Sequence, residues 1–243
     1  IETIMKKQSV GNNISMVTSN WNFENIENTF DNHINKSIPF YQETHKIALK
    51  CSEFFNTQDS FFLDIGCSTG TLIKKFRRKY DKKNFNIKFL GLDTVPSMIK
   101  KAKKNNKDKR VNFMLKSIID FKPKKNFNYI TSIFTLQFIN AQERQKAYDK
   151  IYSIISNGGA FVIFEKVLAN NSKYQDIFNG VYNDFKRENN FSEKEISLKS
   201  LSLRGKLDTF TSKENINCLK KAGFRKISVI FKWFCFEGYL CVK

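Results

Sequence analysis

Short apolar runs alternate with longer stretches of helical periodicity along the middle of the chain. The apolar runs are bounded by polar or small residues and predict strands at Phe61–Gly66, Asn86–Asp93, Arg110–Leu115, Phe127–Ile133 and Ala160–Glu165. Apolar residues at helical spacing predict helices at Thr71–Tyr80, Pro96–Lys104 and Ala141–Ser156, and the turn Asn157–Gly159 is expected to end the last of these. Such alternation predicts an α/β fold in which helices cover both faces of a parallel sheet.

The two flanks of the chain break this alternation. Residues 1–20 are polar and lack a period, so we expect a flexible lead there. Two amphipathic helices, Trp21–Lys36 and Tyr41–Asn56, are expected to form a lid over the loop that follows the first strand. After the fifth strand, the pattern predicts a helical insertion around Lys173–Asn190 and a helix at Ser212–Ala222 that ends at Gly223.

The chain ends in two β-rich runs, Ile227–Trp233 and Phe234–Val242, which are close enough to pair as an antiparallel hairpin. A doubly wound parallel sheet closed by such a hairpin is typical of class I methyltransferases. We therefore expect a Rossmann-like, mostly parallel seven-stranded sheet. It should form one domain over residues 21–243, with a helical lid at 21–57 and a helical insertion at 170–211.

Composition places the chain among globular proteins. Its 243 residues are 41% hydrophobic and include twenty-five Phe. The sequence contains no apolar run of membrane-spanning length, and its start does not resemble a secretory signal. The five Cys show no CxxC spacing, so we expect reduced thiols in a cytoplasmic protein and no metal site.

The net charge of +19 ordinarily indicates a nucleic-acid partner. Only seven of the 42 basic residues are Arg, however. The basic clusters Lys79–Lys83, Lys103–Arg110 and Lys122–Lys125 fall in loops that lead into strands, at the edge opposite the ligand crevice of such sheets. We expect a solvated basic edge and little direct nucleic-acid binding.

The chemistry is centred on Phe61–Gly70, where a buried strand runs into a glycine turn and a helix start. Backbone N–H groups at a helix start and glycines that allow a close approach suit a bound nucleotide. Asp93 ends the second strand, where a carboxylate can accept both ribose hydroxyl protons. The alternative for Asp93 is a helix N-cap before Pro96. Asp64, the Gly66–Gly70 loop and Asp93 together predict a nucleoside site.

The segment Gly66–Gly70 also fits the G-x-S-x-G elbow of hydrolases. Such enzymes carry their His after the Ser in chain order, whereas His33 and His45 both precede it. The hydrolase is therefore rejected, and Cys67 fails as a nucleophile for the same reason. Two strand ends, Phe134–Phe138 and Glu165–Lys166, add polar residues at the crevice, with Gln137 among them.

Residues 21–243 resemble the carboxy-S-adenosylmethionine synthase family, whose members act in tRNA wobble-uridine modification. The matching segments are Ser37–Tyr41, Asp64–Ser68, Leu92–Asp93, Pro96–Ile99, Phe134–Phe138, Asp149–Tyr152, Gly158–Gly159, Glu165–Lys166, Asp184–Arg187, Ser192–Ser197 and Lys221–Phe224. The resemblance implies a dimer that binds S-adenosylmethionine and uses prephenate, a small-molecule substrate, to carboxylate the methyl group of the cofactor. It implies cofactor contacts at Tyr41, Gly66, Cys67, Ser68, Asp93 and Thr94, and we add Asp64 and Gly70 from the loop.

Three positions depart from the pattern of that family. The Asp that faces the adenine aligns with Ser117, beside Ile118, and an Asn at the end of the fourth strand aligns with Ile133. The Arg that meets the new carboxylate of the product aligns with Ser200, which cannot replace a charge-assisted pair. Arg204, four residues on, is the candidate substitute.

Three functions therefore stay open. An S-adenosylmethionine-dependent methyltransferase with an unknown acceptor stands first, since it needs alignment of an acceptor and no dedicated base. A carboxy-S-adenosylmethionine synthase is the alternative, and an idle cofactor-binding or tRNA-associated protein is the third. Candidate catalytic residues are Tyr41, Gln137 and Arg204.

Overall fold

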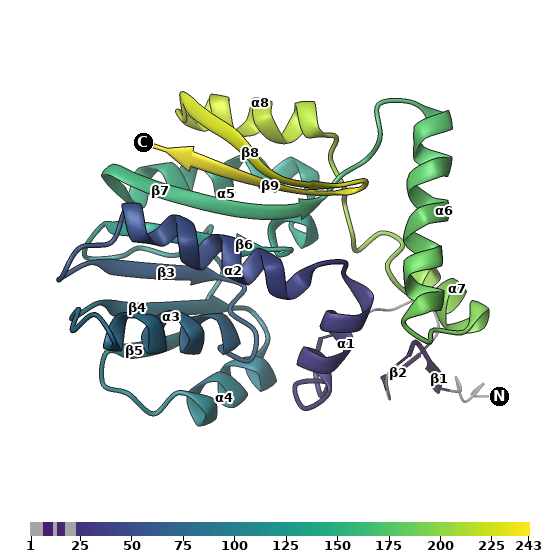
Figure 1. The fold of residues 1–243 in the computed structure, drawn as a ribbon, viewed down its shortest axis with the longest axis horizontal. Coiled ribbons are helices and arrows are strands. Elements are labelled where there is room, and N and C mark those ends of the chain that lie inside the picture. Colours follow the sequence, from purple (N-terminus) through teal and green to yellow (C-terminus); the bar gives the residue numbers. More distant parts are fainter. Residues whose placement is uncertain (1–6, 12–13, 18–22) are drawn as a thin grey trace.

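A seven-stranded sheet forms the centre of the molecule (Figure 1). The computed structural model describes residues 7–11, 14–17 and 23–243. The strand order is β5-β4-β3-β6-β7-β9-β8. Their bounds are β3 Phe61–Ile65, β4 Lys88–Asp93, β5 Val111–Leu115, β6 Phe127–Ile133, β7 Ile155–Lys166, β8 Lys226–Trp233 and β9 Phe236–Val242. Neighbouring strands from β5 to β7 are parallel, whereas β9 is antiparallel to both β7 and β8. The expected sheet, closing hairpin included, is confirmed.

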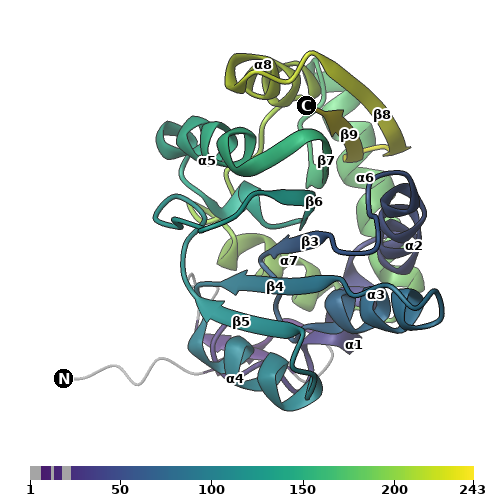
Figure 2. The ribbon, with the colours of Figure 1, turned by 90° about the vertical axis from the view of Figure 1, so that its left-hand side faces the viewer.

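Helices cover both faces of the sheet, and Figure 2 shows α2 and α3 on one face and α5 and α8 on the other. The bounds are α1 Phe30–Ser37, α2 Tyr41–Cys51, α3 Thr71–Asp81, α4 Pro96–Asn105, α5 Ala141–Ile154, α6 Ser172–Glu188, α7 Glu193–Ser202 and α8 Ser212–Ala222. Alternate strand residues face opposite layers: Phe62 packs with Phe76 of α3, and Leu63 with Ile151 of α5. This is the period of two that a sheet buried on both faces requires.

The N-terminal part differs from the expected one. The helix predicted at Trp21–Lys36 begins only at Phe30, because the chain turns before it and Asn25 has a φ of +62°. Trp21 itself lies outside the described residues. The lead expected to be flexible contains two short paired strands, β1 (Lys7–Ser9) and β2 (Ser15–Val17), in its described part. Val10 and Ile14 between them are buried in an apolar cluster with Phe30.

The turn expected at Asn157–Gly159 lies inside β7. Helix α5 ends at Ile154, and the strand continues from Ile155, which is buried and pairs with Phe127. The glycine pair occupies an irregularity of this ladder, with φ of +74° at Gly158. The predicted helix end at Ser156 and strand start at Ala160 were wrong, because pairing of Ile155 with Phe127 begins the strand earlier.

The insertion after β7 holds α6 and α7, which stand beside the carboxyl ends of the strands together with α1 (Figure 1). Its second helix starts in a capping box, in which Ser192 and Glu195 satisfy each other's backbone N–H groups. None of the described helices is long and apolar enough to cross a bilayer.

Candidate cofactor and substrate site

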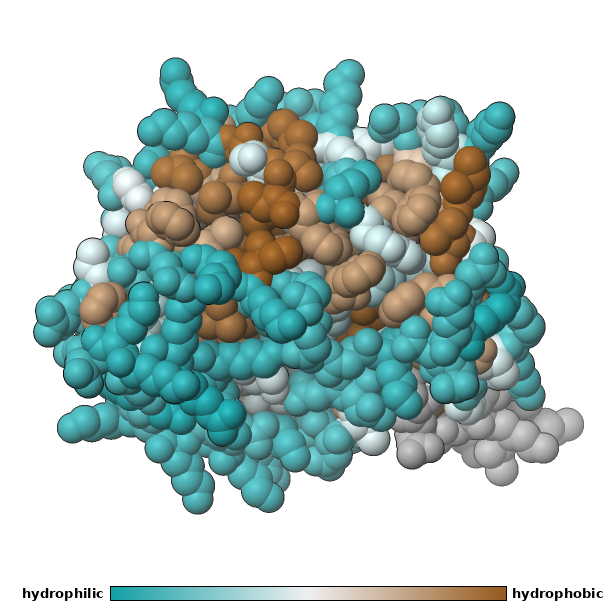
Figure 3. All heavy atoms as spheres, in the orientation of Figure 1, coloured by the Kyte–Doolittle hydropathy of each residue, from teal (hydrophilic) through white to brown (hydrophobic). Residues whose placement is uncertain are grey.

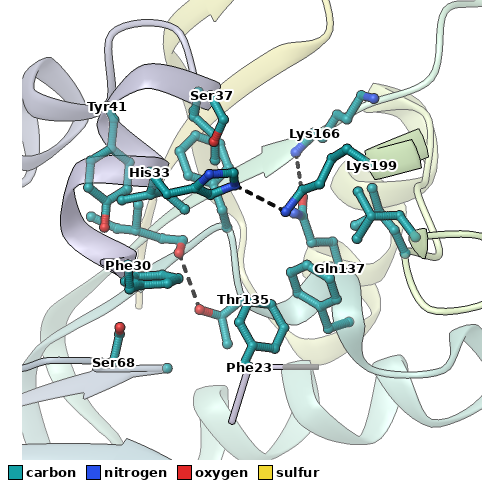
Figure 4. A pocket seen from close by; sticks show the side chains of 18 of the residues that line it. Phe23, Phe30, His33, Ser37, Tyr41, Ser68, Thr135, Gln137, Lys166 and Lys199 are labelled. Carbon is teal, nitrogen blue, oxygen red and sulfur yellow. Dashed lines mark hydrogen bonds between the residues drawn. The ribbon is translucent and has the colours of Figure 1, made fainter. Parts of the chain in front are cut away.

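A cavity of about 850 Å³ lies at the carboxyl ends of β3, β4, β6 and β7, and α1, α6 and α7 wall its outer side (Figure 4). This is where ligands bind in open α/β sheets. Eight of the predicted cofactor residues line it: Tyr41, Gly66, Ser68, Asp93, Thr94, Ser117, Ile118 and Ile133. The three catalytic candidates line it as well: Tyr41, Gln137 and Arg204.

The loop after β3 is fixed by its own backbone. The N–H groups of Gly66 and Cys67 both donate to the carbonyl of Leu92, at 2.8 and 2.9 Å. Gly66 has a φ of +74°, and a Cβ there would lie 2.1 Å from Oγ1 of Thr135. The loop is therefore a rigid cradle that only a glycine completes.

The carboxylate of Asp93 accepts backbone hydrogen bonds from the loop after β3 and from the turn after β4. Its Oδ2 accepts from the N–H of Ser68 at 2.8 Å, and its Oδ1 accepts from the N–H of Val95 at 3.0 Å. Burial raises the pKa of this carboxyl, and these backbone donors oppose the shift. Each oxygen keeps a lone pair for a further donor. The alternative of a helix N-cap at Asp93 is wrong, because the N-cap of α4 is Val95, whose side chain makes no capping hydrogen bond; Asp93 instead holds the turn before the helix, which leaves room for a ribose contact.

Asp64, Cys67 and Gly70 stand behind the wall of the cavity rather than on it. Oδ1 of Asp64 accepts from the hydroxyl of Thr131 at 2.7 Å, and burial raises the pKa of Asp64 to about 7. Burial also holds the pKa of the Cys67 thiol well above its usual value, which suppresses the thiolate. These residues support the cradle from behind.

The lid residue Tyr41 stands at the start of α2, with its ring 4.6 Å from the His45 ring and 6.3 Å from that of Phe134. Burial raises its pKa, so the hydroxyl keeps its proton at neutral pH. Tyr41 can therefore donate a hydrogen bond into the cavity but is not a base.

The other two catalytic candidates differ in setting. Gln137 is buried, and its Oε1 accepts from the N–H of Lys166 at 2.8 Å, which leaves its NH₂ group as a donor (Figure 4). Arg204 and Ser200 are exposed at the rim of the cavity. Among the residues that the structure describes, no cluster of His, Cys, Asp and Glu fits a metal ion.

A group of basic side chains in the cavity was missed from the sequence, although Lys166 had been placed at the crevice edge. Lys166 ends β7, Lys186 and Lys199 come from α6 and α7, and His33 comes from α1. The ring of Tyr182 separates two of them, with Nζ of Lys186 at 3.9 Å from the ring centre and Nζ of Lys166 at 4.9 Å. We refer to Lys166, Lys186 and Lys199 as the lysine cluster.

Burial lowers the pKa of all three lysines, to about 8 for Lys186 and well below the usual value for Lys199. The lysines also lower one another's pKa, since Lys166 acts on Lys186 and Lys186 on Lys199. A bound anion would oppose both effects, because its negative charge raises the pKa of the lysines around it. The sequence signal was present in the matching segments Asp184–Arg187 and Ser192–Ser197, which contain or adjoin two of these lysines.

Comparisons with known proteins agree with this geometry. The family model described as "Methyltransferase domain" matches residues 62–159. A carboxy-S-adenosyl-L-methionine synthase of Staphylococcus epidermidis is 39% identical over 92% of this chain and 97% of its own length. The enzyme of the same name from Nautilia profundicola is 32% identical over 90% and 93%.

Solved structures share the fold at low identity. Human N-acetylserotonin methyltransferase in complex with SAM superposes with a TM-score of 0.59 at 16% identity, over 90% of this chain and 55% of that one. An O-methyltransferase family protein from Burkholderia thailandensis gives a TM-score of 0.64 at 12% identity, over 89% and 59%. These structures therefore share the fold of this chain.

Proposed function

The chain belongs to the carboxy-S-adenosyl-L-methionine synthase family, and from this premise we propose that it carboxylates the methyl group of S-adenosylmethionine. It has the fold of the S-adenosylmethionine-dependent methyltransferases and is an S-adenosylmethionine-dependent transferase. The cofactor supplies a sulfonium centre that activates its methyl group. What the chain adds is the cradle, the carboxylate of Asp93 and a second compartment, by which we mean the part of the same cavity that the lysine cluster lines.

The observation that carries the proposal is the lysine cluster. Among the described residues that line the cavity, the carboxylates are Asp93 and Glu193. Asp93 is held by the cofactor cradle, and Glu193 is paired with Arg187. A compartment lined by several basic side chains favours an anionic second substrate, because a carboxylate that leaves water needs a partner that can carry a positive charge. Prephenate, which the family resemblance implies, carries carboxylates of this kind.

The residues around the two compartments have separable roles. The cradle and Asp93 hold the nucleoside part, and Tyr41 and Gln137 offer neutral donors next to it. The lysine cluster binds the carboxylates of the second substrate, and the apolar walls of Phe30 and Phe138 exclude water. This alignment of two ligands in a closed cavity is the main catalytic contribution of the chain.

Incubation with S-adenosylmethionine and prephenate, followed by mass spectrometry of the cofactor, tests the proposal. We expect a gain of one CO₂ in mass. Conversion of the cofactor to its demethylated form, with the methyl group found on a separate acceptor, would establish the methyltransferase instead, the function that Ser200 favours. Calorimetry that shows no binding of S-adenosylmethionine, of its demethylated form or of the carboxylated form would exclude both.

We further propose a cytoplasmic homodimer that serves tRNA modification through its small-molecule product, without binding RNA directly. Exposed apolar residues on the hairpin and on α6 support the homodimer, and Figure 3 shows them over β8–β9 and along α6. They include Val229, Phe234, Tyr174 and Ile177, which are between 38% and 54% exposed. Exposed apolar surface of this kind typically marks an interface. Sedimentation as a monomer at micromolar concentration would contradict the dimer.

A further inference from the structure

His33 and Lys199 meet across the cavity from two helices that are far apart in the chain (Figure 4). Nε2 of His33 and Nζ of Lys199 are 3.2 Å apart, which fits a hydrogen bond in which the lysine donates. His33 belongs to α1 of the lid, and Lys199 belongs to α7 of the insertion. The contact therefore joins the two elements that enclose the second compartment.

The imidazole of His33 is held in place by its neighbours. It is buried, and its ring meets the ring of Phe191 edge to face at 5.8 Å. A Cβ on Gly11 would lie 2.2 Å from the same Phe191 ring, so the β1–β2 segment packs tightly behind it. Burial and the charge of Lys199 lower the pKa of His33 to about 3. At neutral pH the ring is uncharged, and it can accept a hydrogen bond without adding a charge to the cavity.

Other charged groups face this pair from α6 and α7. Lys186 lowers the pKa of Lys199, and Glu195 raises that of His33. The carboxylate of Glu195 also accepts from the hydroxyl of Ser9 and from the N–H of Ser192, at 2.8 and 3.0 Å. Glu195 thus caps its own helix, while Lys199 extends toward the centre of the cavity (Figure 4).

We infer that His33 is a positioning residue for Lys199, and that this pair, rather than Arg204, anchors the carboxylate which distinguishes the carboxylated cofactor from S-adenosylmethionine. This inference rests on the proposed function. Nζ of Lys199 lies inside the cavity and is oriented by a neutral acceptor, whereas Arg204 is exposed at the rim. A carboxylate that reaches Nζ stabilises the charged form of Lys199, so binding takes up a proton from solution.

Calorimetry with the carboxylated cofactor and with S-adenosylmethionine gives the ratio of the two affinities, which is the selectivity of the anchor. We expect Lys199→Met to reduce this ratio by about tenfold or more, since a charge-assisted pair in a closed site is lost. His33→Phe removes the acceptor, and we expect a loss of about three- to tenfold. His33→Gln keeps an acceptor oxygen, and we expect it to restore the ratio to within about twofold of the wild type. Lys194→Met, at an exposed lysine of the same helix, serves as the matched control.

A second measurement needs no variant. Binding to the wild-type protein is repeated in two buffers of different ionisation enthalpy. We expect a larger proton uptake with the carboxylated cofactor than with S-adenosylmethionine. Equal uptake for the two ligands, or a ratio unchanged in Lys199→Met, would overturn the anchor. Equal damage in His33→Gln and His33→Phe would overturn the positioning role of His33.

The outcome is separable from that of the proposed function. If prephenate adds no CO₂ to the cofactor but the affinity ratio falls in Lys199→Met, the anchor stands and the proposed reaction fails. If CO₂ is added but the ratio does not depend on the pair, the reaction stands and the inference fails.

Discussion

At the scale of the residue, burial beside the site changes the pKa of one side chain, that of Asp64. The residue is buried in β3, and its carboxylate accepts a hydrogen bond from the hydroxyl of Thr131. In the folded protein the carboxyl keeps its proton up to about pH 7, whereas an unfolded chain releases it near its ordinary value of 3.8. Between these values the native state binds more protons than the unfolded state, so the free energy of unfolding falls as the pH rises.

Asp64→Asn removes this titration and keeps an acceptor for Thr131. We expect the variant to be more stable than the wild type by on the order of 2–4 kcal/mol at pH 8, because one pKa unit corresponds to about 1.4 kcal/mol. The gain in stability should be smaller at pH 5, because the wild type has lost less of its free energy of unfolding there than at pH 8. Urea unfolding at the two values of pH measures it, with Asp176→Asn on the exposed surface of α6 as the control. A gain independent of pH would contradict the account.

At the scale of the element, the cradle after β3 depends on two separate properties of Gly66. Its φ of +74° disfavours a side chain, and Thr135 occupies the space in which a Cβ would lie. Gly158 has the same φ of +74°, but nothing lies within 4 Å of its missing Cβ. A comparison of Gly66 with Gly158 therefore separates the cost of backbone strain from the cost of a clash with Thr135.

We expect Gly158→Ala to destabilise the protein by about 1 kcal/mol, the cost of a left-handed residue. Gly66→Ala should cost at least about 3 kcal/mol, because the strain and the overpacking add. It should also abolish binding of S-adenosylmethionine. Urea unfolding and calorimetry on both variants give the comparison, and equal losses would show that the contact with Thr135 contributes nothing.

The elements that could be predicted from the sequence are those with a strong period and clear ends. Helix α8 and strand β6 have the predicted bounds, because a capping threonine and a C-terminal glycine define the helix, and a run rich in apolar and β-branched residues defines the strand. The N-terminal segment failed because Ile26 keeps a helical spacing to Phe30 although it packs from a turn. The apolar spacing before Phe30 reflects packing in the cluster that Ile26 and Phe30 share, and not a helix.

The site divides in the same way. The cradle and Asp93 could be predicted because each follows directly from a strand end. The lysine cluster could not, since its members come from three elements and single lysines have no spacing to recognise. The contact of His33 with Lys199 could not be predicted for the same reason, as the two residues are 166 positions apart in the chain.

On the scale of the whole molecule, basic side chains gather in two separate places. The lysine cluster faces the cavity, whereas Lys79–Lys83, Lys103–Arg110 and Lys122–Lys125 lie at the ends of the strands opposite to it. Some of this basic edge is neutralised within the chain. Lys79 and Lys83 pair with Glu53, and Arg110 pairs with Asp81 and Asp108.

We therefore expect weak binding of tRNA with a shallow dependence on salt, despite the net charge of +19. A protein that neutralises six to ten phosphates loses roughly 10³–10⁵ in affinity between 50 and 200 mM salt. Charges that are already paired release few counterions, and scattered lysines on loops do not track a phosphate backbone.

Fluorescence anisotropy with labelled tRNA over this range of salt concentration measures the slope. Glu53→Gln, which frees Lys79 and Lys83 from their partner, should steepen it by about one ion, since each phosphate contact adds about 0.9 to the slope. A steep slope in the wild type would instead show that the basic edge is an RNA surface, and the product would then be made on a protein already bound to tRNA.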